Sequence, residues 1–490
     1  MDSSWRGILR SLCRAPISLD FGCMQCVSSF NQVAFPFNIP KRNNHRSKWK
    51  GSMTKLYEPS IPKLMEAMAA EAQGLKGMDR RNFLKGGIAA VAGLSSVSMI
   101  PKANASSNLP PNLPEWQKSL GPGVVSKPYG VPSGFEDLQR RTVPWLTADA
   151  ASSISMTPLQ DLDGIITPSG VVFERYHGGI PNVDPDQHRL IIHGLVDRPI
   201  VLSMDDIRRF PSVSEIRFIE CPANGGMEWR GAQMEALQFT HGMLSCCEWT
   251  GVRLSTLLEE VGVKPEGKWV LAEGSDASGM SRSIPMEKAL DDAIVAWGQN
   301  GEALRPEQGY PLRLLLPGYE GNMSVKWLRR LEVGDMPWHH REETSKYTDL
   351  MPDGTARRFT FVQETNSVVT SPCPEKPLRH RGFLEVQGFA WSGRGKIKAV
   401  DVSFDGGVNW QRAELKGLVL DKALTRFSIN TQWNGEPWLL QSRAIDETGY
   451  VQPTLKQLRD ERGGWSIYHK NSIHTWNVTE SGEVFNVQIT

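Results

Sequence analysis

The chain has 490 residues and a net charge of +1, from 55 Lys and Arg against 54 Asp and Glu. This length suits two domains, and the balanced charge gives no reason to expect nucleic acid or an anionic membrane as a partner. The 7 cysteines form no evenly spaced disulfide framework and no Cys-x-x-Cys-His, so no haem attachment is expected.

Residues 79–105 have the pattern of an export signal. Arg80 and Arg81 precede a mildly apolar run, and Ala103-Asn104-Ala105 provides small residues for cleavage. The paired arginines resemble a twin-arginine signal, which predicts export of the folded protein to the periplasm. The apolar run is too short for a membrane span. The alternative is an amphipathic helix of the mature protein.

The sequence predicts three regions. Residues 1–105 comprise an upstream extension and the signal, 106–350 the catalytic domain, and 351–490 a second domain. The stretch before the signal shows no clean pattern, and we expect translation to start at Met53 or Met78.

The catalytic region mixes strands and helices, which predicts an α+β fold. Several of its strands end in loops rich in Gly, Asn or Ser, where binding sites are commonly built. Helices are expected to begin at Ser203 and to span 254–261, with a polar loop over 274–285. Strands are predicted over 171–177, 189–196, 216–220, 268–272, 293–297, 311–316 and 325–333.

The stretch from Ile216 to Gly231 places a cysteine at the end of a strand. Pro222 after Cys221 ends the strand, and Asn224-Gly225-Gly226 supplies a tight loop that can approach a ligand closely. A thiolate presented in this way suits a soft metal. The alternative is a buried structural cysteine.

Cationic and hydrogen-bonding residues recur in the loops of this region. They would form a cradle for a large polar anion, such as a phosphate-bearing cofactor. The alternative for Arg175 is a surface arginine, and for His177 a residue that caps the core. No G-x-G-x-x-G or G-x-x-x-x-G-K-[ST] pattern accompanies them, so no usual nucleotide site is expected. The residues of the cradle are Arg175, His177, Ser283, Arg313, Ser324 and Lys326.

From Phe359 onward the pattern changes to short strands with turn signals, such as Asp405-Gly406-Gly407. Together with scattered Trp and little helix, this predicts an all-β sandwich of immunoglobulin type. The expected work of this region is packing, oligomerisation or closure of one wall of the site. The predicted strands are 383–391, 397–404, 437–445 and 484–489.

An ordered set of short motifs resembles the sulfite oxidase family of molybdenum enzymes from about residue 155 to the end. No single motif is specific, but their order matches the family. They are Phe173-x-Arg-x-His177, Cys221-x-x-Asn224, Trp249-x-Gly-x-x-Leu254, Ser283-Ile-Pro285, Asn300-Gly301, Pro311-x-Arg313, Pro317-Gly318, Val325-Lys326-Trp327, Gly388-Phe-Ala-Trp-Ser392, Val402-x-x-Asp405-Gly-Gly407 and Val451-Gln-Pro453.

The resemblance implies one molybdenum–molybdopterin per chain, with Cys221 as the metal's thiolate ligand. It implies that Arg175 orients the substrate, that Tyr347 stands where the family has an active-site tyrosine, and that the second domain serves dimerisation. The residues implied to hold the cofactor are Phe173, Glu174, Arg175, Tyr176, His177, Asp276, Ser283, Arg313, Ser324, Val325 and Lys326.

Three departures bear on the substrate. Members that oxidise free sulfite carry basic residues where this chain has Gly225 and Gly226, and a histidine of the pterin site is replaced by Gln308. The stretch CPANGGMEWRG, with the export signal, resembles the molybdenum subunits of sulfane dehydrogenases. That resemblance implies sulfur on a carrier protein as substrate, a c-type cytochrome subunit as electron acceptor, and a homodimer or heterotetramer.

Other functions remain open at this point. A free sulfite dehydrogenase is the principal alternative, followed by a reductase of the same fold and an assembly subunit without cofactor. Cys246 and Cys247 are expected to be two buried thiols near a helix–loop junction.

Overall fold

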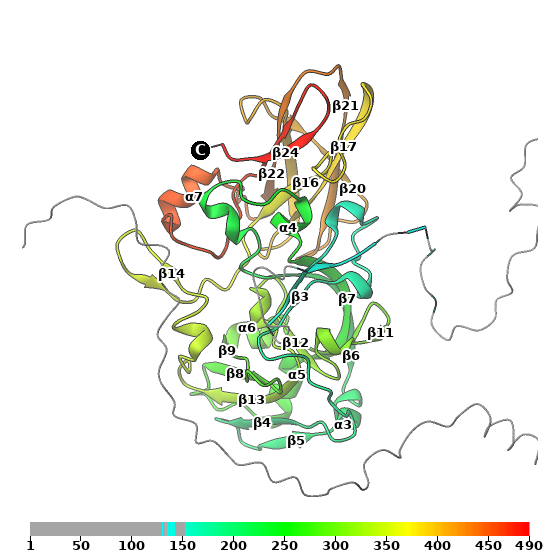
Figure 1. Ribbon diagram of the computed structural model, residues 1–490. Helices are drawn as coiled ribbons and strands as arrows, with labels where there is room; N and C mark the ends of the chain where they lie inside the picture. Colours follow the sequence, from blue (N-terminus) through cyan, green and yellow to red (C-terminus); the bar gives the residue numbers. More distant parts are fainter. Residues whose placement is uncertain (1–129, 131–132, 134, 137, 143–151, 490) are drawn as a thin grey trace, which may run out of the picture. The chain divides into compact units, whose positions relative to one another are not determined.

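The computed structural model describes residues 130, 133, 135, 136, 138–142 and 152–489. These residues belong to one compact unit, Pro128–Thr490 (Figure 1). The predicted signal at 79–105 and the upstream stretch lie outside the described residues. No helix in the described ranges is long and apolar enough to cross a membrane.

In one sheet of the catalytic region, an edge strand ends directly before Cys221. Its strand order is β11-β10-β7-β6, with β12 also paired to β10, and every pairing is antiparallel. The strands are β6 (Ser212–Glu220), β7 (Leu244–Arg253), β10 (Ile294–Gln299), β11 (Glu302–Ala303) and β12 (Arg313–Leu315).

The catalytic region contains a second five-stranded sheet. Its order is β5-β4-β13-β8-β9, antiparallel except for the parallel pair of β4 and β13. Two small sheets, β1-β2-β3 and β14-β15, accompany it. The strands are β1 (Arg141–Thr142), β2 (Ile154–Met156), β3 (Glu174–Arg175), β4 (Leu190–Gly194), β5 (Ile200–Leu202), β8 (Trp269–Gly274), β9 (Ser281–Pro285), β13 (Leu328–Gly334), β14 (Asp349–Leu350) and β15 (Ala356–Arg357).

Short helices connect these strands. The capping box predicted at Ser203 forms with Asp206, and the helix predicted over 254–261 buries one apolar face. The helices of this region are α3 (Met204–Arg208), α4 (Leu237–His241), α5 (Leu254–Val261) and α6 (Met286–Asp291). The 3₁₀ turns are η3 (Leu159–Asp161), η4 (Ser169–Val171), η5 (Gly226–Arg230), η6 (Pro306–Gln308), η7 (Gly321–Met323) and η8 (Arg341–Glu343).

The second region contains two antiparallel sheets, β16-β17-β21-β20 and β19-β18-β22-β23-β24. Apolar residues of both sheets, including Phe389, Leu440 and Trp476, enter one core cluster, as in a two-layer sandwich. The strands are β16 (Asn366–Ser371), β17 (Gly382–Trp391), β18 (Ile397–Ser403), β19 (Gln411–Arg412), β20 (Glu414–Lys416), β21 (Thr425–Trp433), β22 (Trp438–Asp446), β23 (Thr475–Val478) and β24 (Val484–Val487).

Three local predictions are wrong. Residues 281–285 form strand β9 rather than loop, and the strand expected from Val171 begins only at Glu174. Cys246 and Cys247 lie inside β7, not at a helix–loop junction, although both are buried free thiols as expected. Strand β7 is buried on both faces, so its sequence lacks the alternation that reveals a half-buried strand.

The two regions share their packing. The core cluster of the sandwich also contains Phe218 of β6 and Cys246 of β7. The second region also has a helix that the sequence analysis missed, α7 (Leu455–Arg462), whose capping box is formed by Thr454 and Gln457. Arg462 at its end pairs with Asp349 of β14 at 3.2 Å, and both side chains are 3% exposed.

This buried ion pair should contribute to stability. Replacing Arg462 with Met leaves the Asp349 carboxylate buried without its cation, which should lower the free energy of unfolding by about 3–5 kcal/mol. The matched control is Lys456→Met, because Lys456 pairs with Asp460 on the same helix at 73% and 65% exposure. That change should cost about 0–1 kcal/mol. Urea unfolding that finds equal losses would contradict the assignment.

Candidate functional site: a cavity beside Cys221

The loop after β6 presents Cys221 in a fixed conformation. The Cys221 amide donates to the carbonyl of Met243 at 3.0 Å, and Asn224 braces the turn. Its side-chain amide donates to the Glu220 carboxylate at 2.9 Å, and its side-chain carbonyl accepts from the Met243 amide at 3.1 Å. Gly225 has φ +71°, a conformation that favours glycine.

The other side of this loop packs against the second region. A Cβ on Gly226 would lie 2.5 Å from the carbonyl oxygen of Ile467, so no larger residue fits there. The His469 amide donates to the Pro222 carbonyl at 2.7 Å, and the Trp391 indole donates to the Glu220 carboxylate at 2.8 Å. Gly226 is thus required by packing of the protein on itself, whereas the sequence predicted an approach to a ligand.

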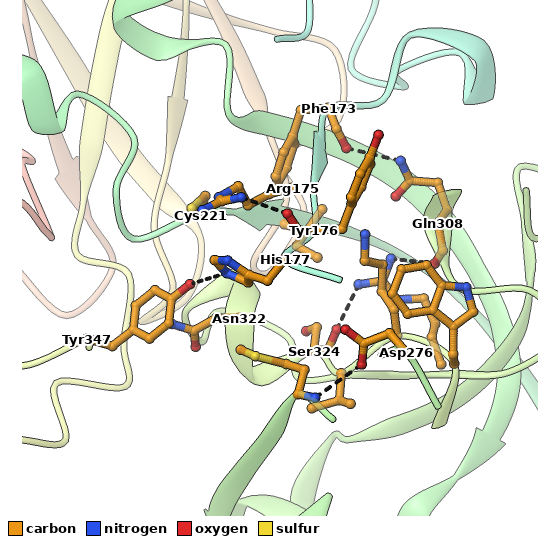
Figure 2. A pocket seen from close by; sticks show the side chains of 17 residues that line it. Phe173, Arg175, Tyr176, His177, Cys221, Asp276, Gln308, Asn322, Ser324 and Tyr347 are labelled. Carbon is orange, nitrogen blue, oxygen red and sulfur yellow. Dashed lines mark hydrogen bonds between the residues drawn. The ribbon is translucent and has the colours of Figure 1, made fainter. Parts of the chain in front are cut away.

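Cys221 lines a cavity formed by residues from several loops and strands. Figure 2 shows side chains from several loops pointing into it. The predicted residues that line it are Phe173, Arg175, Tyr176, His177, Cys221, Asp276, Arg313, Ser324, Val325, Lys326 and Tyr347. It is also lined by Gln308, which the resemblance places where the family has a histidine of the pterin site. Five further lining residues were not predicted to hold the cofactor, namely Ile219, Met280, Gly321, Asn322 and Trp327.

Two predicted residues do not line this cavity. The carboxylate of Glu174 pairs with Arg140 and accepts from the Ser155 hydroxyl at 3.0 Å. The hydroxyl of Ser283 donates to Glu343 at 3.0 Å. Both side chains are therefore engaged in structural contacts. Both residues lie on strands, and the sequence could not reveal which way each side chain points.

One wall of the cavity is cationic. Arg313 is 2% exposed and donates to the carbonyls of Gln308 and Ser324, each at 3.0 Å. Lys326 donates to the carbonyl of Glu307 at 2.9 Å. Burial, and next the charge of Arg313, lower the pKa of Lys326 to about 7. An anionic guest would favour the charged lysine and raise this pKa again.

The opposite wall contains Arg175, His177 and Tyr347. The hydroxyl of Tyr347 lies 3.4 Å from His177 Nε2, and Arg175 donates to the carbonyl of Tyr176 at 2.7 Å (Figure 2). Burial, followed by the charges of Arg175 and Arg341, lowers the pKa of His177 to about 4. The imidazole is therefore neutral near pH 7, so one of its nitrogens can accept a hydrogen bond.

Cys221 is the soft donor at this cavity. Burial raises the pKa of its thiol to about 11, so it keeps its proton at neutral pH unless a metal replaces it. Within the described part of the chain, no group of three or more His, Cys, Asp or Glu could hold a metal ion.

Two family models match the two regions of this chain. Residues 177–342 match the family model "Oxidoreductase molybdopterin binding domain", and residues 357–476 match "Mo-co oxidoreductase dimerisation domain". Mouse mitochondrial sulfite oxidase is 31% identical over 383 residues, covering 71% of this chain and 67% of that protein. The chain belongs to the sulfite oxidase family.

Two further proteins extend the comparison. The NADH nitrate reductase of Ulva prolifera is 32% identical over 279 residues, which cover 51% of this chain but 32% of that reductase. The crystal structure of the sulfane dehydrogenase SoxCD from Paracoccus pantotrophus matches with a TM-score of 0.76 at 54% identity. It covers 77% of this chain and 98% of the matched chain.

The cofactor of this family, molybdenum–molybdopterin, fits the residues present. The cavity offers one thiol for the metal, and the cations Arg313 and Lys326 for an anionic pterin phosphate. Lys326 adds an indication, because its ammonium is only partly exposed and no carboxylate among the described residues is hydrogen-bonded to it. Since a partly buried cation is stabilised by an opposite charge, the cavity is suited to an anionic guest.

Lys326→Met removes this positive charge from the cavity. Losing one charged hydrogen bond should weaken cofactor binding by about 1.5–3 kcal/mol, or about ten- to a hundred-fold in affinity. The molybdenum-to-protein ratio of purified protein should fall, whereas Lys456→Met, on the exposed surface, should leave it unchanged. A full molybdenum content in Lys326→Met would contradict a role for this lysine.

Proposed function

We propose that this protein is the molybdenum subunit of a sulfane dehydrogenase. It would oxidise sulfane sulfur bound to a carrier protein during thiosulfate oxidation and pass electrons to a c-type cytochrome subunit. The observation that carries this proposal is the 54% identity with the sulfane dehydrogenase SoxCD over 98% of the matched chain. Identity to mouse sulfite oxidase is 31%. Free sulfite oxidation with the same cofactor is the second candidate.

The surroundings of Cys221 support this order of candidates. Gly225 and Gly226 carry no charge after Cys221, and the Ile467 carbonyl leaves no space for an arginine at 226. The aromatic rings of Tyr347 and Tyr468 pack together at 5.1 Å on this side. A small free oxyanion prefers cationic groups, whereas sulfur at the end of a carrier's side chain carries less charge.

The predicted residues that line the cavity have proposed roles. When bound, molybdenum–molybdopterin supplies two-electron redox chemistry in which oxygen from water is transferred to sulfur. Cys221 would hold the metal, Arg175 would orient the substrate, and Tyr347 would fix the neutral His177. The pterin and its phosphate would be held by Phe173, Tyr176, His177, Asp276, Arg313, Ser324, Val325 and Lys326.

Assembly and location follow from the same proposal. This chain has no Cys-x-x-Cys-His, so electrons must leave through a partner, for which a cytochrome c subunit is suitable. The match of residues 357–476 to a dimerisation domain supports a homodimer or heterotetramer, formed through an immunoglobulin-like sandwich. Arg80 and Arg81 support export to the periplasm by the twin-arginine route.

The substrate can be tested directly with protein matured in a host that makes the cofactor. Glutathione persulfide serves as a small sulfane donor, free sulfite as its competitor, and oxidised cytochrome c as the acceptor. We expect kcat/KM for the persulfide to exceed that for sulfite by at least about ten-fold, or about 1.4 kcal/mol in the activation barrier. A reversed preference would establish the sulfite dehydrogenase instead.

Cys221 should be indispensable for this activity. Cys221→Ser replaces the soft thiolate with a poor ligand for the metal, so turnover should fall by at least about a hundred-fold in a protein that remains folded. Cys246→Ala is the control, because Cys246 is buried in β7 away from the cavity lining. Equal activity of the two variants would refute the assignment of Cys221.

A further inference from the structure

A buried arginine lies one layer behind the wall of the cavity. Arg282 of β9 is 0% exposed, and none of its three guanidinium nitrogens has a hydrogen-bond partner among the described residues. Its charge is balanced by Glu343 at 3.7 Å and Glu320 at 4.0 Å. The ring of Tyr347, which does line the cavity, has its centroid 5.4 Å from the guanidinium carbon.

The carboxylates of Glu343 and Glu320 accept hydrogen bonds from donors other than Arg282. Glu343 accepts from the amide and hydroxyl of Ser283, and Glu320 accepts from the side-chain amide of Asn322 at 3.0 Å. They therefore neutralise Arg282 without fixing its orientation through hydrogen bonds. The face of an aromatic ring attracts a cation, and more strongly in a desolvated site such as this one.

The position of Tyr347 has to be stabilised by its surroundings. Its backbone has φ +53°, a left-handed conformation that is unfavourable for a tyrosine and persists only where the surroundings enforce it. Its ring also contacts Tyr468, and its hydroxyl lies at His177 Nε2, 3.4 Å away. A displacement of the ring would break that contact and change the wall facing the substrate.

We propose that Arg282 is a positioning residue, whose buried charge holds the ring of Tyr347 so that the tyrosine hydroxyl stays at His177. The proposal rests on the proposed function, in which Tyr347 and His177 belong to the active site. Arg282 itself does not line the cavity, so it acts through Tyr347 and not on the substrate.

The activity should depend on the positive charge of residue 282 and not on the shape of its side chain. We would measure kcat and KM of the holoenzyme with glutathione persulfide for Arg282→Met and Arg282→Lys. Displacement of an active-site group by about 1 Å can cost up to about a hundred-fold in rate, so Arg282→Met should lower kcat by about ten- to a hundred-fold. KM should stay within about two-fold, and Arg282→Lys should keep most of the activity. Equal losses in both variants would overturn the proposal.

A double-mutant cycle with Tyr347→Phe tests whether Arg282 acts through this tyrosine. Without the hydroxyl, Arg282→Met should have little further effect on kcat. If the two losses multiply, the residues act independently and the proposal is refuted. If Arg282→Met does not fold, the charge-balanced pair Arg282→Met with Glu343→Gln replaces it, and Glu343→Gln alone is its control.

A crystal structure of the Arg282 variant provides a readout that does not depend on the substrate. We expect the Tyr347 hydroxyl to lie out of hydrogen-bond reach of His177 Nε2, and an unmoved hydroxyl would overturn the proposal. If wild-type protein turns over sulfite but not the persulfide, the proposed function fails, while the displacement of Tyr347 still tests the role of Arg282.

Discussion

The site depends on the contacts that hold the loop after β6, which contains Cys221, against the second region. Gly226 lets the Ile467 carbonyl approach, and the His469 amide binds the Pro222 carbonyl on the same side. Because these contacts come from a segment more than 200 residues away in the sequence, the cysteine can take its position only after both regions have packed together. This accounts for the single compact unit that contains them.

The charged side chains around the cavity are also held in place by hydrogen bonds within the protein. Arg313 and Lys326 donate to backbone carbonyls, which hold the side chains in place, and no acidic side chain of the described residues is hydrogen-bonded to them. Across the cavity His177 is kept neutral by burial and neighbouring arginines. The protein thus prepares a positive surface for an anionic cofactor and a neutral acceptor beside Tyr347. Cys221 adds the one thiol that lines this cavity.

Sequence reasoning succeeded where the signal is local. The capped helix at Ser203 and the apolar face of α5 were predicted because side-chain spacing alone determines them. It failed for β7 and for the pairing of Tyr347 with His177, since a fully buried strand lacks alternation and a contact across 170 residues leaves no spacing to recognise. Arg282 stands inside Ser281–Pro285, which was predicted to be loop, so nothing in the sequence marked it as buried.

The central claim is that Cys221 provides the protein's ligand to molybdenum. X-ray absorption at the molybdenum edge tests it most directly, on wild type and on Cys221→Ser protein that has kept its metal. The account predicts one sulfur neighbour fewer at the metal in the variant, with the pterin sulfurs unchanged. An identical number of sulfur neighbours in the two proteins would contradict it, and the metal would then have to be held without Cys221.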